Sequence, residues 1–358
     1  MRRARGLSLV ELLIAMTLGL VIISGSIAVF SANRRSAELN AAIAEMQDGA
    51  RFALSALASD IRMSGFQGCL DPNHGRINIP AKDAPTTDLR LSATTGAVVA
   101  TPTRWEPAAP AGFVPAAEHR AVPGTHVLAL QFGNARSSAL AAPMATPSDV
   151  LTLAGGLGVE AGDLAIVANC DFGDLFRVSA RSADGRVLEH AASHNATGNL
   201  TRSYGSTRTL AQTRVMAFES NIYFVGESVL EHADGTPVRA LFRQTLPHDP
   251  LRNPPTVIVD GVENLRIAFG LRDGRTLRYV TPGDAGFDPA RVETVRVGLL
   301  MSSFEAVTDQ EDERTYVLAG QPIHASDDAD DPDAHPRDRR HRLSFDTTVK
   351  VRNRRSGT

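Results

Sequence analysis

Glu11 is the residue whose position most needs a chemical explanation, because it stands at the start of a long apolar run. The run extends from Leu12 to Phe30, and about 20 apolar residues are enough for a helix that spans a membrane. A carboxylate inside such a helix costs roughly 2.5 to 3.5 kcal/mol on insertion scales, and less near the membrane surface. We therefore expect Glu11 to have a partner of opposite charge and a specific role.

The two cysteines, Cys69 and Cys170, are the other reactive side chains that we consider. An even pair in an oxidising compartment indicates one disulfide bond. Formation of this bond requires that the chain is exported past the membrane. The alternative is that the two residues are unrelated buried thiols.

The sequence contains no motif typical of a catalytic, metal or nucleotide site, such as His-Glu-x-x-His, Gly-x-Ser-x-Gly or a P-loop. The acidic run Asp327 to Asp333 offers oxygen ligands for calcium, but it lacks the glycine and the terminal glutamate of an EF-hand loop. We favour a solvated loop between strands. The basic run Arg337 to Arg342 follows at once and either neutralises the acidic run or faces a partner. We predict no enzymatic activity, no cofactor and no metal.

A single long helix is expected to carry Glu11 and to end shortly before Cys69, since no proline occurs between Met1 and Leu70. Gly65 is expected to cap its C-terminus. A helix from Leu7 to Ser64 would be about 85 Å long at 1.5 Å per residue. Its first half needs lipid or partner helices, and its second half needs a domain packed against it. That second half has an amphipathic stripe with apolar residues at spacings of three and four: Leu39, Ile43, Met46, Ala50, Leu54, Leu57 and Ile61.

The chain after Leu70 is predicted to be rich in β-structure. Residues Asp71 to Thr125 are rich in Pro, Ala, Thr and Gly and are expected to be mainly loop with short strands. Asp-Gly pairs at 184–185, 234–235, 260–261 and 273–274 mark turns, several of them hairpin turns. The candidate strands are Val127–Phe132, Val150–Leu153, Leu164–Ala168, Leu175–Ser179, Val215–Val225, Ala240–Thr245, Val257–Val259, Leu265–Leu271, Thr294–Met301 and Leu343–Val351.

The N-terminus closely resembles the type IV prepilin signature, in which a short basic leader and a glycine precede an apolar helix whose fifth residue is glutamate. Gly6, Leu7 and Glu11 occupy these positions. The resemblance implies that a prepilin peptidase cuts between Gly6 and Leu7 and methylates the new amino terminus, and that Glu11 serves assembly. The family usually begins its mature chain with Phe, for which Leu is a tolerated apolar substitute.

Two alternatives for the N-terminus are an ordinary secretory signal peptide and a plain single-span anchor. A signal peptide normally has an apolar core of about 7 to 15 residues, which is shorter than this run, although the segment Ala28 to Ala32 offers a small-residue cleavage site. Neither alternative explains the position of Glu11.

Four later blocks, together with the N-terminal motif, resemble the PilW type of minor pilin. We therefore predict an α+β fold of the type IV pilin kind, in which a β-rich head packs against a long N-terminal helix. The predicted segments are a leader at 1–6, a transmembrane and assembly helix at 7–30, an amphipathic spine at 31–65 and a β-rich periplasmic head at 66–358. The blocks are Gly65 to Cys69, Asp260 to Leu265, Val292 to Ser303 and Phe345 to Arg354.

The resemblance implies a minor pilin, a structural subunit that helps to initiate type IV pilus assembly at or near the tip. Its implied partners are other minor pilins, the major pilin, the prepilin peptidase and the inner-membrane assembly machinery. The implied location is the inner membrane with a periplasmic head before assembly, and the extracellular pilus afterwards. A minor pseudopilin of type II secretion, or a DNA-uptake or adhesion module on a pilin stalk, are the alternatives.

The charge balance bears on the nucleic-acid alternative. The chain has 37 basic and 40 acidic residues, and loss of Arg2, Arg3 and Arg5 with the leader leaves 34 against 40, a net charge near −6. A net acidic chain argues against a nucleic-acid partner.

Overall fold

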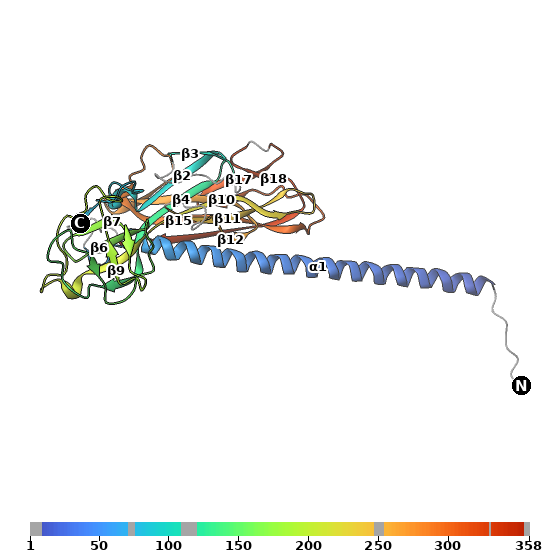
Figure 1. Ribbon diagram of the computed structural model, residues 1–358. Coiled ribbons are helices and arrows are strands. Elements are labelled where there is room, and N and C mark those ends of the chain that lie inside the picture. The colour runs from blue at the N-terminus through green and yellow to red at the C-terminus, as the bar shows by residue number, and fades with distance from the viewer. Residues whose placement is uncertain (1–8, 71–75, 109–119, 247–253, 329–330, 354–358) are drawn as a thin grey trace, which may run out of the picture.

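The computed structural model describes residues 9–70, 76–108, 120–246, 254–328 and 331–353. It consists of one long N-terminal helix and a β-rich head, with 20% of the residues in helices and 43% in strands, which confirms the predicted α+β, pilin-like fold. The helix lies against one side of the head with its C-terminal part and protrudes far beyond the head with its N-terminal part (Figure 1).

Helix α1 extends from Leu9 to Met63, and its 55 residues span about 80 Å at 1.5 Å per residue. The predicted amphipathic stripe faces the head and is buried or half-buried along its whole length. Two alanines that the stripe did not include, Ala53 and Ala58, are buried as well. Small side chains at this contact allow the helix to pack closely on the strands.

The C-terminal end of α1 is closed by a glycine and by a residue near the far end of the chain. Gly65 has a φ of +74°, in the left-handed region that favours glycine, so the predicted glycine cap is confirmed. The side-chain amide nitrogen of Asn353 lies 3.2 to 3.4 Å from the carbonyl oxygens of Arg62, Met63 and Ser64. These are carbonyl groups that a helix end leaves without partners.

The larger of the two main sheets has nine strands: β1 (Ile77–Asn78), β2 (Thr94–Thr101), β3 (Arg104–Glu106), β4 (His126–Ala139), β6 (Leu164–Ala168), β7 (Gly173–Arg177), β10 (Arg214–Glu231), β11 (Pro237–Leu246) and β12 (Thr256–Asp260). Their order is β1-β7-β6-β10-β4-β2-β3, and β11 pairs with β10 and β12. Strand β10 organises this sheet, because it pairs with β4, β6 and β11.

The second main sheet has the order β14-β13-β15-β19. Its strands are β13 (Val262–Asp273), β14 (Thr276–Val280), β15 (Val292–Ala306) and β19 (Arg340–Lys350). All of its strand pairs are antiparallel. Helix α1 contacts β15, β19 and β12, so its second half lies across both sheets.

The main core lies between α1 and the two sheets, and both faces of β10 are buried. Tyr223 and Val225 point into the core shared with α1 and the second sheet. The alternate residues Ile222 and Phe224 point into a separate core on the opposite face, together with Trp105. This alternation follows from the two-residue period of a strand.

A smaller lobe and two three-stranded sheets complete the head. The lobe has its own apolar core, which includes Val167, Phe176 and Val215. The remaining elements are β5 (Leu151–Thr152), β8 (Ala180–Arg181), β9 (Val187–Glu189), β16 (Tyr316–Leu318), β17 (Gln321–Ser326), β18 (Ala334–Pro336), α2 (Leu89–Ser92), η1 (Leu210–Gln212) and η2 (Pro289–Arg291).

Each of the ten candidate strands corresponds to an observed strand, and the Asp-Gly pairs at 184–185, 234–235 and 273–274 lie in hairpin turns. The pair at 260–261 instead connects β12 to β13, which belong to different sheets. The expectation of mainly loop with short strands before His126 was incomplete, because β2 is an eight-residue strand of the larger sheet.

Candidate assembly interface

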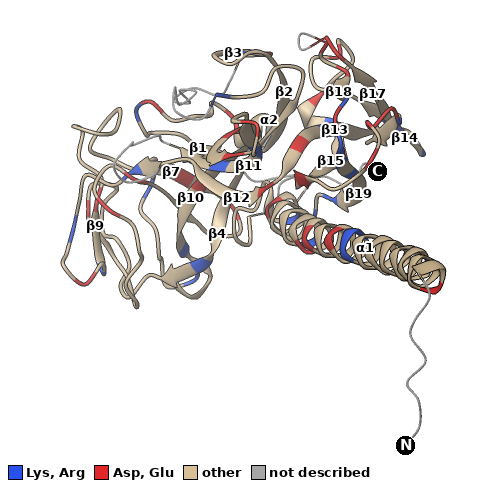
Figure 2. Cartoon of the chain, turned by 90° about the vertical axis from the view of Figure 1, so that its right-hand side faces the viewer, with Lys and Arg blue, Asp and Glu red and all other residues tan. Residues whose placement is uncertain are grey.

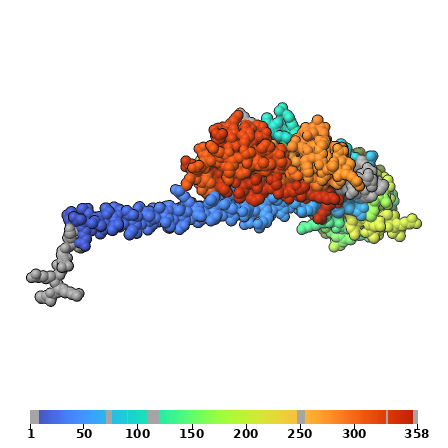
Figure 3. Space-filling view, turned by 180° about the vertical axis from the view of Figure 1, so that it is seen from behind, coloured from blue at the N-terminus to red at the C-terminus, as the bar shows by residue number. Residues whose placement is uncertain are grey.

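The protruding part of α1 is apolar and exposed on all sides. Its large apolar side chains from Leu9 to Phe30 are 50 to 75% exposed. Its most apolar 18-residue window has a mean hydropathy of 2.4, and none of that window is buried. Figure 3 shows this part of the helix free of the head. A helix that is apolar all round requires a lipid or protein environment, and the length of this one is sufficient to cross a membrane.

Glu11 is the only acidic residue in the first turn of α1. Within the described part of the chain its carboxylate forms no ion pair and no hydrogen bond with another side chain. In Figure 2 the charged residues of α1 lie mostly further along, where the helix reaches the head. Gly6 and Leu7 lie outside the described residues, so cleavage between them and the role of Glu11 stay predictions.

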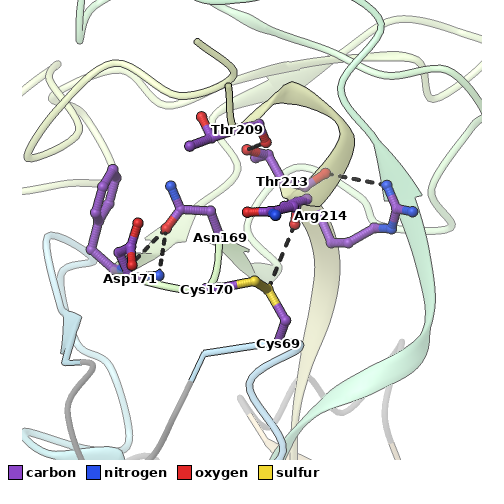
Figure 4. The surroundings of a disulfide bond; sticks show 9 residues. Cys69, Asn169, Cys170, Asp171, Thr209, Thr213 and Arg214 are labelled. Atoms are coloured by element: carbon purple, nitrogen blue, oxygen red, sulfur yellow. Dashed lines mark hydrogen bonds between the residues drawn. A yellow bond between two sulfur atoms is a disulfide. The ribbon is translucent and has the colours of Figure 1, made fainter. Parts of the chain in front are cut away.

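The predicted disulfide between Cys69 and Cys170 is present, with the two Cα atoms 4.8 Å apart and 101 residues of sequence separation. Cys69 follows the end of α1, and Cys170 lies in the turn between β6 and β7. The side-chain oxygen of Asn169 accepts hydrogen bonds from the backbone amides of Asp171 and Phe172 at 2.9 and 3.0 Å and shapes this turn (Figure 4). The disulfide therefore ties the end of the helix to the head.

A buried polar contact fixes α1 against β10. The Tyr223 hydroxyl and the Asn221 side-chain amide donate to the same carboxylate oxygen of Asp60, at 2.6 and 2.8 Å. Burial, together with the negative charge of Asp60, raises the pKa of the Tyr223 hydroxyl, which therefore stays protonated and remains a donor. This contact positions the last two turns of the helix on the sheet.

Arg342 of β19 and Glu263 of β13 form a buried ion pair across β15, which lies between these two strands in the sheet. The Arg342 side chain is fully buried and Glu263 is 7% exposed. Two nitrogens of Arg342 lie 2.6 and 2.9 Å from the two oxygens of Glu263, which is a bidentate arrangement. Asp338 lies 2.8 Å from the third nitrogen, Nη1, and also accepts a hydrogen bond from Nη2 at 3.0 Å.

The environment of this pair keeps both residues charged. Burial alone would raise the pKa of Glu263, but the charge and hydrogen bonds of Arg342 outweigh it and hold that pKa below its usual value. The nearby Asp312 behaves in the same way, because hydrogen bonds from Arg314 and Tyr316 outweigh burial and lower its pKa to about 2. These charges are structural, since they pair within the interior of the head.

The acidic run forms part of the head through ion pairs. Asp327 lies 3.5 Å from Arg337, Asp331 lies 2.9 Å from His324, and Asp333 lies 2.8 Å from Arg266. Only the first of these partners belongs to the basic run that follows. Over the described ranges, no three His, Cys, Asp or Glu side chains are grouped so that they could hold a metal ion.

The sequence reasoning missed Asp60, Glu263, Arg342 and Asn353 as structural residues. A signal was present for Glu263, which lies in β13, a strand whose residues are buried on both faces. A charge in such a strand requires an opposite charge, but the sequence does not show which of its many arginines supplies it.

Comparison with known families agrees with these features. The family described as Type IV Pilus-assembly protein W matches residues 222–353, which include β13, β15, β19 and Asn353. The Prokaryotic N-terminal methylation motif matches residues 1–27. No curated protein and no solved structure matches the chain.

These matches and the fold agree on one family. The pilin family is structural rather than catalytic, and the methylation motif together with the exposed apolar helix fits a membrane-anchored pilin. Over these two segments the chain is similar to the PilW type of type IV pilins, and the matches support a PilW-type pilin.

Proposed function

We propose that this protein is a minor pilin that helps to initiate type IV pilus assembly at or near the pilus tip, together with other minor pilins. A prepilin peptidase removes residues 1–6 and methylates Leu7. The subunit waits in the inner membrane with its head in the periplasm and then enters the pilus. In this proposal residues 7–30 form the membrane and assembly helix, residues 31–65 form the spine, and residues 66–358 form the head.

The observation that carries the proposal is the apolar part of α1, which is exposed on all sides and has Glu11 at its start. Such a helix is stable in a bilayer and leaves it only when similar helices replace the lipid around it. The same segment therefore suits both storage in the membrane and packing in a filament.

Glu11 fixes the axial offset between neighbouring helices in the filament. After cleavage, the free amino group of a neighbouring subunit is the charge that Glu11 pairs with in the apolar bundle. Leaving either charge alone in such surroundings costs several kcal/mol. Neighbouring helices are thereby held at a fixed offset.

The nearest alternative is a minor pseudopilin of type II secretion, which would share the N-terminal motif and the same physics. The match of residues 222–353 to a pilus-assembly family favours the pilus. Pilin partners and secretion partners are different sets, so loss of the gene distinguishes the two. We expect loss of pili with normal secretion, and the reverse result would favour the pseudopilin.

A variant of Glu11 tests the proposed mechanism. Glu11→Ala, expressed in a strain without the native protein, should reach the membrane and lose its leader normally but enter pili poorly. Glu11→Asp should be intermediate, because the charge remains and its reach is shorter. Incorporation of the Ala variant at the wild-type level would contradict the role of Glu11.

A further inference from the structure

An acidic groove runs between α1 and the head close to where the helix leaves the head. It consists of two hollows of about 410 and 490 Å³. The hollows adjoin, because Ala42, Glu45 and Phe304 line both of them. On the helix the groove extends from Glu38 to Gly49, which is about 16 Å at 1.5 Å per residue. Figure 3 shows the C-terminal part of the head overhanging the helix in this region.

The groove has an apolar floor, to which Met46, Met301 and Val259 contribute. Gly49 keeps the floor open, because a Cβ atom there would lie 3.0 Å from Val259 and 3.3 Å from Met301. Methionine side chains are flexible and polarizable, and they accommodate different partners.

The charges around this floor have one sign. None of the residues that line the two hollows is Lys, Arg or His. Glu38 pairs with Arg34 outside the groove, and Asp48 lies 3.7 Å from Arg51. The other acidic residues of the lining form no ion pair within the described part of the chain: Glu45, Asp260 and Glu305.

Asp260 contributes a half-buried carboxylate to the lining of the groove. Its Oδ1 atom is buried and, among the described residues, has no hydrogen-bond partner. An ammonium or guanidinium group in the groove would place a positive charge beside this carboxylate and offset its negative charge.

We propose that this groove binds a basic segment on the head of a neighbouring, different pilin subunit. An arginine or lysine side chain would lay its aliphatic stem on Met46 and Met301 and place its charge at Glu45 and Asp260. The inference rests on the proposed function and adds to it the chemistry of the partner. A subunit whose helix lies beside α1 reaches the groove, because the groove flanks the same helix that carries the apolar segment.

Anionic lipid fits the structure less well as an occupant, because the carboxylates of the groove repel it and the groove begins about 12 Å beyond Phe30.

Photo-crosslinking of the full chain in its native strain identifies the occupant. Benzoylphenylalanine at Ala42, which lines both hollows, should form an adduct with a Lys- or Arg-bearing segment of another pilin, mapped by peptide mass spectrometry. The adduct should fall at least tenfold when Glu45→Lys is added. An adduct with lipid, with a second copy of this chain, or with a segment lacking basic residues overturns the proposal, as does the absence of any adduct.

Two variants that each replace a glutamate by lysine, one in the groove and one outside it, test whether the groove is needed for entry into pili. Glu45→Lys should reach the membrane at the wild-type level but enter sheared pili at least tenfold less. Glu189→Lys makes the same charge change at an exposed residue of β9, a strand at the end of the head away from the protruding part of α1 (Figure 1), and should behave as wild type. Equal incorporation of both variants contradicts the groove proposal. Absence of the wild-type chain from pili would instead refute the proposed function, while the Ala42 adduct still decides what the groove binds.

Discussion

The ion pair between Arg342 and Glu263 gives the sharpest prediction about the head. Substitution Arg342→Met removes a fully buried guanidinium and leaves the buried carboxylate of Glu263 without its bidentate partner. The other carboxylates near Arg342 keep arginine partners, since Asp312 pairs with Arg314 and Asp338 pairs with Arg340. The loss of stability in this variant therefore comes mainly from the unpaired carboxylate of Glu263.

The expected loss of stability is large for a single substitution. Removing one partner of a buried pair costs about 3 to 5 kcal/mol, whereas replacing both partners by apolar residues of similar volume is often nearly neutral. Arg342→Met should therefore lower the free energy of unfolding by about 3 to 5 kcal/mol. The double variant Glu263→Leu, Arg342→Met should recover most of this loss.

The pH dependence of the free energy of unfolding that comes from Glu263 should have opposite signs in the wild type and in the Arg342→Met variant. In the wild type the pKa of Glu263 is lowered, so its contribution to stability is present above the unfolded pKa and is lost as the pH falls through the folded pKa. Without Arg342, burial dominates and raises that pKa above its unfolded value. The variant should therefore become more stable as the pH falls from 7 toward 5, because the buried carboxyl takes up a proton.

Urea unfolding of the full chain in mild detergent measures both effects. The only tryptophan, Trp105, is 4% exposed and reports on the head by its fluorescence. Arg104→Met is the control, since Arg104 and Glu106 form an exposed pair and should cost less than about 1 kcal/mol. A loss below 1 kcal/mol for Arg342→Met, with no reversal of the pH trend, would refute the reasoning.

Three further predictions concern the helix and its attachment. Replacing Cys69 and Cys170 by Ser should destabilise the chain by up to about 4.7 kcal/mol, the chain-entropy figure for a loop of about 100 residues; urea unfolding measures this, and unchanged stability contradicts it. Tyr223→Phe removes the hydroxyl that donates to Asp60 and should cost about 1.5 to 3 kcal/mol in the same assay, whereas a neutral effect would mean that this contact does not hold the helix. Gly6→Val should block leader cleavage by sterics, so its product should retain Met1 on intact-mass analysis, and normal processing would count against the prepilin interpretation.

Local patterns in the sequence were sufficient to predict the helix and most strands. The stripe from Leu39 to Ile61 and the glycine at position 65 predicted the docking face and the end of α1, because both signals depend on helical periodicity and backbone conformation. Strand β6 was predicted with the observed bounds, since it is a short apolar run next to turn residues.

Features that depend on contacts between distant residues were not predictable from one sequence. Strand β2 has the sequence TTGAVVAT, in which small residues hide a strand that is fixed by pairing with β4. Strand β14 has three exposed residues and lacks an apolar pattern of its own, and it is fixed by antiparallel pairing with β13. The partners of Glu263 and Asp60 lie 79 and 161 to 163 positions away, so only the folded chain identifies them.

The mature N-terminus of the chain in purified, sheared pili tests the central claim most directly. Mass spectrometry of that material should find a peptide that begins at methylated Leu7 and contains Glu11. This result would show that the chain is processed as a prepilin and incorporated into the filament. A chain that begins at Met1 or after Phe30, or that is absent from pili while present in the membrane of the same cells, would contradict the account.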